Sequence, residues 1–254
     1  MYIDSHTHIS KKYYDSIDIV IKNAYEANVK YLILSCCELD EIDEGISIAN
    51  EYKNVFLAIG LHPSEVNKYN DGNLEYIKNI AITNNKVVAI GEIGLDYHYD
   101  DTNREKQRIL FEKQLQLAEE INKPVVIHTR DATKDTIDIL KKYKLKGVIH
   151  CFNGSKETLK EYLNMKYKVG IGGVVTFKNT NLPEILKTTS IENILLETDS
   201  PFLSPVPFRG EKNESKNIPI IAKKISEIYN ISQKEVEEKT SKNTIELFDL
   251  KHLL

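Results

Sequence analysis

Histidines and acidic residues recur in this sequence directly after short apolar runs. The first run, Tyr2–Asp4, leads into His6 and His8, which are separated by one residue. Because side chains two positions apart on an extended backbone point to the same side, both imidazoles could reach one metal ion. Two solvated or hydrogen-bonded histidines are the alternative interpretation of this pair taken alone.

Four more candidate ligands follow later apolar runs. Glu92 comes after Val87–Ile90 and has a glycine on either side, where a ligand can approach the backbone closely. His128 and His150 end two consecutive runs, and Asp199 follows the last one. Each alone could be a polar group satisfied at the edge of the core. Together they predict a shared metal site, because random placement would have scattered them over the helices as well.

The predicted ligand set is large enough for two ions. It consists of His6, His8, Glu92, His128, His150 and Asp199. Mixed imidazole and carboxylate ligation suits Zn, Mn or Fe, and added water and substrate oxygens could accommodate Mg. Six ligands exceed one tetrahedral shell, so we expect two divalent ions about 3.5–4 Å apart with a water between them whose pKa falls towards neutrality.

Two of these residues also have a predicted catalytic role. Glu92 is the candidate carboxylate that bridges the two ions. Asp199 could bind one ion and also take the proton from the attacking water. Because histidines must be neutral to coordinate a metal, we expect metal affinity to fall below about pH 6.5.

The elements that must position these residues alternate between apolar runs and amphipathic segments. Eight runs predict parallel strands buried on both faces, which favours continuous apolar stretches over strict alternation. They are Tyr2–Asp4, Val29–Leu34, Val55–Ile59, Val87–Ile90, Pro124–Ile127, Gly147–Ile149, Val169–Ile171 and Ile194–Leu196. The clearest helical spacing lies over Asn103–Asn122, with Thr102 and Glu105 as a capping box.

A closing helix is predicted near the end of the sequence. Ser232 with Glu235 forms a second capping-box pattern, and Leu247 and Phe248 would pack the last turn of this helix onto the strands. A length of 254 residues is normal for one (β/α)₈ barrel. We therefore predict an α/β fold, a TIM-type (β/α)₈ barrel that forms a single domain over residues 1–254. An open doubly wound sheet would give similar patterns.

Composition restricts the class of protein. No signal peptide and no apolar stretch of roughly 18 residues is evident, so we expect a cytoplasmic protein without a membrane partner. Three cysteines cannot form a disulfide framework and fit a reducing compartment. The formal charge of −4 gives no global attraction for nucleic acid, so any such binding must be local and assisted by metal.

Taken together, these motifs resemble the TatD family of metal-dependent deoxyribonucleases, within the amidohydrolase-like superfamily of barrels. The matching segments run nearly from end to end. They are Asp4–His8, Gly60–Pro63, Gly91–Tyr97, Ile127–Arg130, His150–Gly154, Thr198–Pro201 and Pro205–Gly210.

The resemblance implies an arrangement of the ligands and a substrate. His6, His8, Glu92 and Asp199 would hold one ion, and Glu92, His128 and His150 would hold the second; Mg, Mn and Zn are the candidate metals. The implied activity is cleavage of DNA, single strands or strand ends, with His62 beside the substrate phosphate. A structural turn residue before a proline is the alternative interpretation of His62. A monomer is plausible.

Three basic residues follow predicted strands and are candidates to contact phosphate: Arg130, Lys178 and Arg209. Ordinary surface charge explains them equally well. The last loop departs from the family pattern, because Glu211 and Lys212 stand where two basic residues are common and Ser215 stands where a proline is usual. These departures affect the expected affinity for substrate. They do not affect the predicted metal ligands.

Two other functions remain open. The same metals could serve a deacylase that acts on misacylated tRNA, or another ester or amide hydrolase. A non-catalytic, metal-stabilised protein that binds nucleic acid is less favoured, because a structural site is usually closed by four ligands. His98 in a loop and His252 in the tail receive no functional role. A redox role for Cys36 and Cys37 has little support, since nothing electropositive flanks them.

Overall fold

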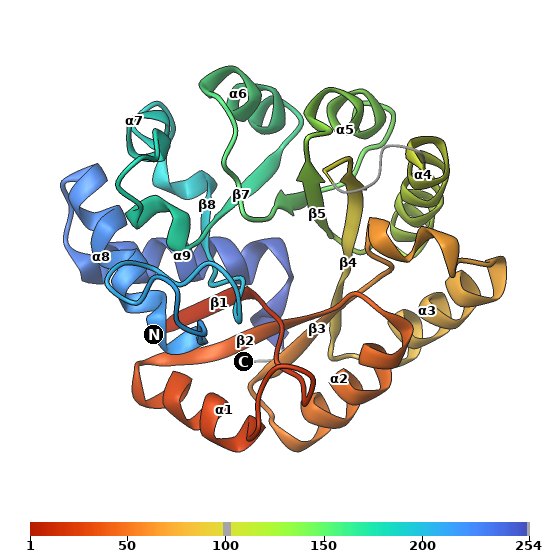
Figure 1. The fold of residues 1–254 in the computed structure, drawn as a ribbon, viewed down its shortest axis with the longest axis horizontal. Coiled ribbons are helices and arrows are strands. Elements are labelled where there is room, and N and C mark those ends of the chain that lie inside the picture. Colours follow the sequence, from red (N-terminus) through yellow and green to blue (C-terminus); the bar gives the residue numbers. More distant parts are fainter. Residues whose placement is uncertain (99–102, 253–254) are drawn as a thin grey trace.

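The computed structural model describes residues 1–98 and 103–252, and its strands form one parallel sheet in sequence order from β1 to β8 (Figure 1). The strands are β1 Tyr2–Thr7, β2 Val29–Cys36, β3 Val55–Ile59, β4 Val87–Asp96, β5 Val125–Arg130, β6 Gly147–Ile149, β7 Tyr167–Ile171 and β8 Ile194–Leu196. A parallel bridge from Thr7 to Ser200 joins the two ends of the sheet, so the barrel is nearly closed. The predicted single-domain (β/α)₈ barrel is therefore confirmed.

Helices surround the strands on the outside of the barrel (Figure 1). The α-helices are α1 Ile17–Glu26, α2 Leu39–Glu51, α3 Asp71–Thr83, α4 Arg104–Glu120, α5 Thr133–Leu140, α6 Lys156–Asn164, α7 Leu182–Leu186, α8 Ile218–Tyr229 and α9 Gln233–Leu247. Short 3₁₀ segments are η1 Pro63–Asn67, η2 Gly173–Thr176, η3 Ile191–Asn193, η4 Ser215–Asn217 and η5 Leu250–His252. None of the helices within residues 1–98 and 103–252 is long and apolar enough to cross a membrane.

The helix caps agree with the sequence where they are described. Ser232 caps α9, because its hydroxyl accepts the backbone N–H of Glu235 at 3.1 Å. The other predicted capping box depends on Thr102, which lies outside the described residues. Helix α4 begins at Arg104, and the side chain of its N-cap residue, Asn103, forms no capping hydrogen bond.

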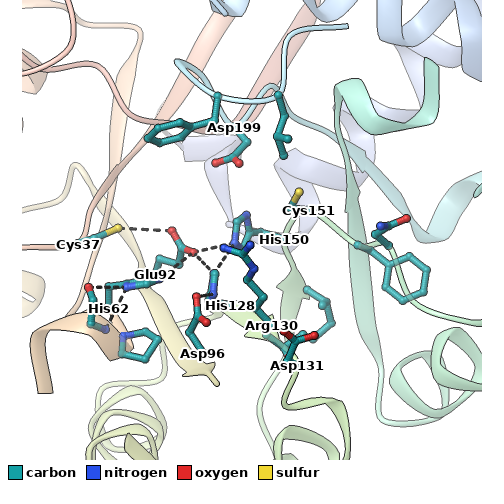
Figure 2. A pocket seen from close by; sticks show the side chains of 18 of the residues that line it. Cys37, His62, Glu92, Asp96, His128, Arg130, Asp131, His150, Cys151 and Asp199 are labelled. Atoms are coloured by element: carbon teal, nitrogen blue, oxygen red, sulfur yellow. Dashed lines mark hydrogen bonds and ion pairs between the residues drawn. The ribbon is translucent and has the colours of Figure 1, made fainter. Parts of the chain in front are cut away.

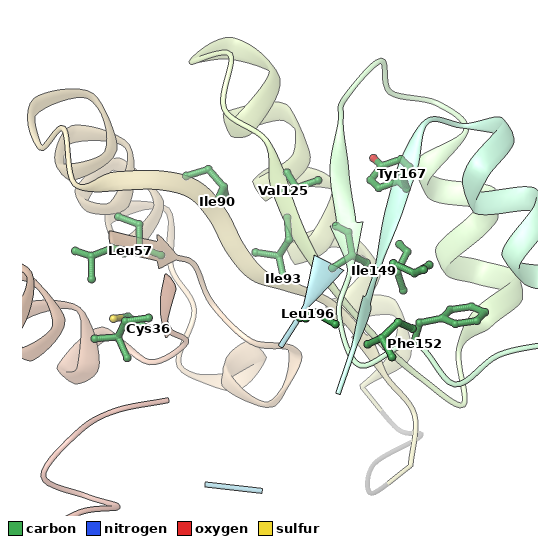
Figure 3. Packing of buried hydrophobic residues seen from close by; sticks show 14 of the residues in the cluster. Cys36, Leu57, Ile90, Ile93, Val125, Ile149, Phe152, Tyr167 and Leu196 are labelled. Carbon is green, nitrogen blue, oxygen red and sulfur yellow. The ribbon is translucent and has the colours of Figure 1, made fainter. Parts of the chain in front are cut away.

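Apolar side chains form two layers, one on each face of the sheet. The larger layer lies between the strands and the helices, and Figure 3 shows some of its members, among them Leu57, Ile90 and Val125. The smaller layer takes the alternate strand residues, such as Phe56 and Val126, and includes Leu247 and Phe248 at the end of α9. The closing helix thus packs onto the strands as predicted.

Strands β4 and β5 extend further than their apolar runs. The sequence predicted ends at Ile90 and Ile127, yet the ladder between the two strands continues to the pair Asp96 and Arg130. Glu92 and His128 therefore lie within strands and not after them. The runs appeared shorter because inward-facing positions change from apolar to polar near the carboxyl ends, where the side chains line a cavity instead of the core.

One glycine lets β4 lie close to β5 at this level. Gly94 has a φ of +149°, a conformation that L side chains rarely adopt. A Cβ at this position would lie 1.9 Å from the carbonyl oxygen of His128. Any other residue at position 94 would push β5, and His128 with it, away from β4.

Candidate metal centre

The six predicted ligands converge at the carboxyl ends of the strands. A cavity of about 1030 Å³ opens there, and His8 is among the residues that line it. Figure 2 shows four of the other ligands in this lining: Glu92, His128, His150 and Asp199. His6 lies beneath them and is buried. The ligands come from β1, β4 and β5 and from the segments that directly follow β1, β6 and β8. The barrel thus brings together residues that are up to 193 positions apart, as for His6 and Asp199.

The first group of donor atoms surrounds the paired imidazoles of β1. The Nε2 atoms of His6 and His8 are 3.1 Å apart. Glu92 Oε2 lies 3.3 Å from His6 Nε2 and 3.7 Å from His8 Nε2. Asp199 Oδ1 lies 3.6 Å from His6 Nε2 and 3.5 Å from His8 Nε2. Oxygens of Glu92 and Asp199 therefore both lie within 3.7 Å of these two nitrogens.

The second group is built on the other oxygen of Glu92. Glu92 Oε1 lies 2.7 Å from His128 Nδ1 and 2.7 Å from His150 Nε2. These two ring nitrogens are 3.2 Å apart. Because the two oxygens of one carboxylate face two separate donor groups, Glu92 has the placement of a bridging ligand.

The spacing and chemistry of these atoms fit divalent cations. Metal bonds of about 2.1 Å place neighbouring ligands about 3.0–3.4 Å apart in octahedral or tetrahedral geometry. Three of the eight separations in the two groups lie in this range. Three others are 3.5–3.7 Å, and the two from Glu92 Oε1 are 2.7 Å. The facing nitrogens of His6 and His8 can share only one proton, and His6 Nδ1 is buried with no hydrogen-bond partner among the described residues. A cation between the two rings would accept the lone pairs of both Nε2 atoms, which repel each other when no proton or cation lies between them.

Asp4 fixes the end of β8 against β1. Its carboxylate accepts the backbone N–H of Thr198 at 3.0 Å and the Thr198 hydroxyl at 2.6 Å. The next residue, Asp199, donates its backbone N–H to the carbonyl oxygen of His6 at 3.0 Å and has a φ of +54°. A non-glycine residue in this region of φ is strained, and such strain is often kept at functional sites. Burial raises the pKa of Asp4 to about 7, although the Thr198 hydroxyl opposes the shift.

Two further carboxylates support histidines of the second group. Asp96 Oδ2 lies 3.1 Å from His128 Nε2, on the opposite side of the ring from Glu92. Glu197 Oε1 lies 3.8 Å from His150 Nδ1 and accepts the backbone N–H of Cys151 at 2.6 Å. A carboxylate that is hydrogen-bonded to a coordinating imidazole, as Asp96 is to His128, holds the ring and its tautomer. His150 Nδ1 has no hydrogen-bond partner among the described residues, so Glu197 acts on it through charge alone.

Glu197 fits against β7 only because position 170 is glycine. A Cβ at Gly170 would lie 1.9 Å from Glu197 Oε2. Sequence reasoning gave no role to Asp4, Asp96 or Glu197. All three are acidic residues within or directly after an apolar strand, which marks them as candidates but does not show which residue each one contacts.

Removal of the Asp96 carboxylate is expected to weaken metal binding while the ligand count stays the same. Without it, His128 loses the acceptor that keeps Nδ1 directed at Glu92. Outer-shell partners of this kind contribute about 10–100-fold in metal affinity. We therefore expect Asp96→Ala to bind divalent metal about 10–100-fold more weakly in chelator competition. Asp131→Asn is the matched control, because Asp131 lines the same cavity but pairs with His98. Unchanged affinity in Asp96→Ala would contradict this role.

The charges in the metal-free site are strongly coupled. Burial opposes ionisation of Glu92, but His150, His128 and His6 outweigh it and hold the pKa of this carboxyl well below its usual range. Burial likewise opposes the charged form of His150, but Glu92 and Glu197 raise its pKa well above the usual value. The pKa of His8 and that of His128 are also raised, because neighbouring carboxylates outweigh burial. Carboxylates thus favour the protonated form of these three histidines, whereas burial and the neighbouring His150 lower the pKa of His6.

These raised pKa values predict that metal binding releases protons near neutral pH. A coordinating imidazole must lose its proton, so acid competes with metal. Because three of the histidines have a raised pKa, the loss of affinity begins above the value of about 6.5 that unperturbed histidines would give. Calorimetric titration with a divalent metal in buffers of different ionisation enthalpy measures the released protons. Binding at neutral pH without proton release would contradict this prediction.

His62 faces the same cavity as a hydrogen-bond donor. Its Nδ1 accepts the backbone N–H of Ser64 at 3.2 Å, so the proton of the neutral ring lies on Nε2. Nε2 is 3.9 Å from Glu92 Oε1. Burial lowers the pKa of His62 to about 4, so the ring is neutral at physiological pH. His62, Asp96 and His128 also form a cluster of donor atoms, but a proton on His62 Nε2 favours a contact with substrate over a third cation.

The predicted phosphate contacts are placed differently from one another. Arg130 lines the cavity, whereas Lys178 and Arg209 are absent from its lining among the described residues. The Arg209 guanidinium lies 4.0 Å from the centre of the Phe177 ring. Arg130 reaches the cavity because it belongs to β5 itself, whereas the other two residues lie further along loops. A contact between any of the three residues and phosphate stays a prediction.

The remaining sequence features have structural partners. Lys212 donates to the carbonyl oxygen of Tyr13 at 2.6 Å, and Ser215 is buried with its hydroxyl 3.5 Å from that of Thr7. Cys37 and Cys151 line the cavity, and burial raises the pKa of each thiol well above its usual value. Protonated thiols are poor nucleophiles, which agrees with the weak case for a redox role.

Comparison with known proteins identifies relatives over the whole chain. A family model described as TatD related DNase matches residues 3–249. The uncharacterized metal-dependent hydrolase YabD of Bacillus subtilis is 37% identical over 253 residues, which cover 98% of this chain and 99% of YabD. The uncharacterized metal-dependent hydrolase YcfH of Escherichia coli is 32% identical and aligns over 98% of this chain and 96% of its own. The crystal structure of the TatD homologue YjjV of Escherichia coli superposes with a TM-score of 0.91 at 28% identity, covering 98% of both chains.

Proposed function

The chain belongs to the TatD family of metal-dependent hydrolases, and from this premise we propose that it is a deoxyribonuclease that cleaves phosphodiester bonds in DNA. Its expected substrates are single strands and strand ends. The description of the matching family model supports a nucleic-acid substrate. The net charge of −4 requires that the grip on DNA be local, at the cavity.

The observation that carries the proposal is that the two carboxylate oxygens of Glu92 face two different groups of donor atoms. Its two oxygens face separate sets of ligands inside one open cavity. When bound there, two divalent ions would lower the pKa of water and neutralise charge on the phosphoryl oxygens. The cavity volume of about 1030 Å³ lies at the upper end of the usual range for small-molecule sites and leaves room for a nucleotide.

The residues around the cavity supply the other parts of the reaction. Asp199 takes a proton from the water that attacks phosphorus, a new P–O bond forms, and the P–O bond to one nucleoside oxygen breaks. The departing nucleoside oxygen takes up a proton from solvent and leaves as a hydroxyl group. The Nε2–H of His62 and the guanidinium of Arg130 donate to phosphate oxygens. Lys178 and Arg209 remain candidates for phosphates further along the strand.

The test is cleavage of a labelled single-stranded DNA by the purified protein. The reaction is run as purified, after chelation, and after return of Mg, Mn or Zn. We expect cleavage that stops with the chelator and returns with at least one of these metals. Charged tRNA and simple esters are assayed in parallel, because the same ligands would serve a deacylase.

Each outcome of this assay has a definite meaning. Metal-dependent hydrolysis of tRNA or esters without cleavage of DNA would overturn the nuclease proposal in favour of a deacylase. Full metal loading without turnover on any substrate would favour a metal-stabilised binding protein. Two ions per chain, a monomer and a cytoplasmic location stay predictions, which metal analysis, light scattering and cell fractionation would test.

A further inference from the structure

Exposed apolar side chains gather on the loop between β8 and α8. Ten large apolar residues are exposed in the described part of the chain, and four of them lie within residues 202–208. They are Phe202, Leu203, Val206 and Phe208. Exposed apolar side chains on a protein surface are usually isolated from one another. A cluster of four in one loop therefore indicates a surface that a ligand or partner covers.

Hydrogen bonds fix the backbone of the loop that carries these exposed side chains. Buried Asn213 donates its side-chain amide to the carbonyl oxygens of Thr198 at 2.9 Å and Phe202 at 2.7 Å. The backbone N–H of Val206 donates to the Thr176 hydroxyl at 2.9 Å. The exposure is therefore built into an ordered loop, which lowers the entropic cost of binding.

The apolar surface begins directly at the candidate metal centre. Phe202 and Tyr13 both line the cavity, and their ring centres are 5.7 Å apart in an edge-to-face arrangement. The Phe202 ring is 6.1 Å from that of His8, a candidate ligand. Phe202 is nevertheless 48% exposed. We call Tyr13 and Phe202 the aromatic ledge; it lies one ring away from where a phosphate would be held.

One lysine borders the ledge, and one arginine belongs to the same loop as Phe202. Lys212 donates to the carbonyl oxygen of Tyr13, and Arg209 lies on the face of Phe177. Neither has a carboxylate within 4.0 Å in the described residues. Lys12 also lies over the Tyr13 ring, 5.3 Å from its centre, and pairs with Glu38 at 2.7 Å and with Glu41 at 3.5 Å. A ligand with both an aromatic part and a negatively charged part therefore fits the ledge, where Lys212 has no carboxylate partner of this kind.

We propose that the aromatic ledge is a base-binding subsite, on which the nucleobase next to the scissile phosphate stacks. Every base offers a π face, so such a surface binds bases without reading their sequence. In a duplex, that face is already stacked on a neighbouring base pair, so the ledge selects single strands and frayed ends. This inference rests on the proposed function and names the part of the substrate that gives selectivity.

Binding of small phosphates tests the ledge without need of DNA cleavage. The probes are deoxyadenosine 5′-monophosphate, deoxyribose 5-phosphate and hexyl phosphate, titrated into the metal-loaded protein. They share a phosphate and differ in carrying a base, no base or a flexible apolar chain. We expect the nucleotide to bind about tenfold more tightly than deoxyribose phosphate, as the loss of one stacked base implies.

Variants then assign this preference to Phe202. Phe202→Ala should bind the nucleotide about tenfold more weakly and deoxyribose phosphate unchanged, whereas Phe202→Tyr should retain the preference. Phe208→Ala is the matched control, because Phe208 is an exposed phenylalanine of the same loop that is absent from the described lining of the cavity. Metal content and thermal unfolding of each variant check that the site and fold are intact.

The outcomes separate the subsite from the nuclease activity. Cleavage of DNA together with equal affinity for nucleotide and deoxyribose phosphate would overturn the ledge and leave the nuclease proposal standing. A Phe202-dependent base preference without DNA cleavage would support the ledge and overturn the nuclease. Binding of hexyl phosphate as tight as that of the nucleotide would show a general apolar surface, suited to an acyl group, and would overturn base stacking.

Discussion

Replacement of Glu92 by glutamine is expected to abolish hydrolysis and to reduce metal content at the same time. The two oxygens of Glu92 face two donor groups, and glutamine offers one oxygen and one N–H₂ group in their place. The N–H₂ group of the glutamine cannot coordinate a cation, so one of the two donor groups loses its carboxylate ligand. Loss of several kcal/mol of charge stabilisation corresponds to a fall in kcat of about a thousandfold or more.

The same substitution has a second, independent signature in the metal-free protein. Glu92 is the main source of the raised pKa of His150, which burial alone would lower. Glu92→Gln should therefore lower the pKa of His150, and nuclear magnetic resonance titration of the histidines in chelator measures it. This readout needs no substrate and no metal. It separates loss of the carboxylate charge from general damage to the fold.

Glu38→Gln is the matched control for this experiment. Glu38 lines the same cavity, but its carboxylate pairs with Lys12 and is outside both donor groups. This variant should keep metal content and turnover near those of the unchanged protein, because a partly exposed pair contributes little. Full metal content and full turnover in Glu92→Gln would refute the bridging role.

The barrel could be predicted from the sequence because each strand is a local feature. Eight apolar runs of suitable length identified all eight strands, and β3, β6 and β8 have the predicted bounds. The ends of β4 and β5 could not be predicted in this way. Their last residues face the cavity on one side and the helices on the other, so the pattern there depends on a space that exists only once the barrel has closed.

The six candidate ligands could be predicted for a related reason, and their supports could not. A ligand is recognisable by its type and by its place after a strand. The role of Asp4 depends on Thr198, which is 194 residues away, and that of Glu197 on the ring of His150 and on Gly170. Nothing local in the sequence states these partnerships, because they arise where β1 and β7 meet the end of β8.

Replacement of Asp199 by asparagine is expected to lower kcat by about 10²–10⁴-fold, the range that general acid–base catalysis contributes. Metal content should fall less than in Glu92→Gln. An asparagine oxygen can still face His6 and His8, and Glu92 remains in the same group. We therefore expect the Asp199→Asn variant to bind metal and substrate but to react slowly. Measurements of kcat, KM and metal content on the same preparation would show this.

The pH profile distinguishes a base from a ligand. Burial opposes ionisation of Asp199, but His8, His150 and His6 outweigh it and hold its pKa below the usual value. The carboxylate is therefore already charged across the pH range in which the histidines lose their protons. The acid limb of activity should reflect metal loading, and Asp199→Asn should keep this limb while its rate is lower at every pH. Asp131→Asn is the control. If Asp199→Asn has the kcat of the wild-type protein at full metal content, Asp199 does not take part in proton transfer and is a ligand alone.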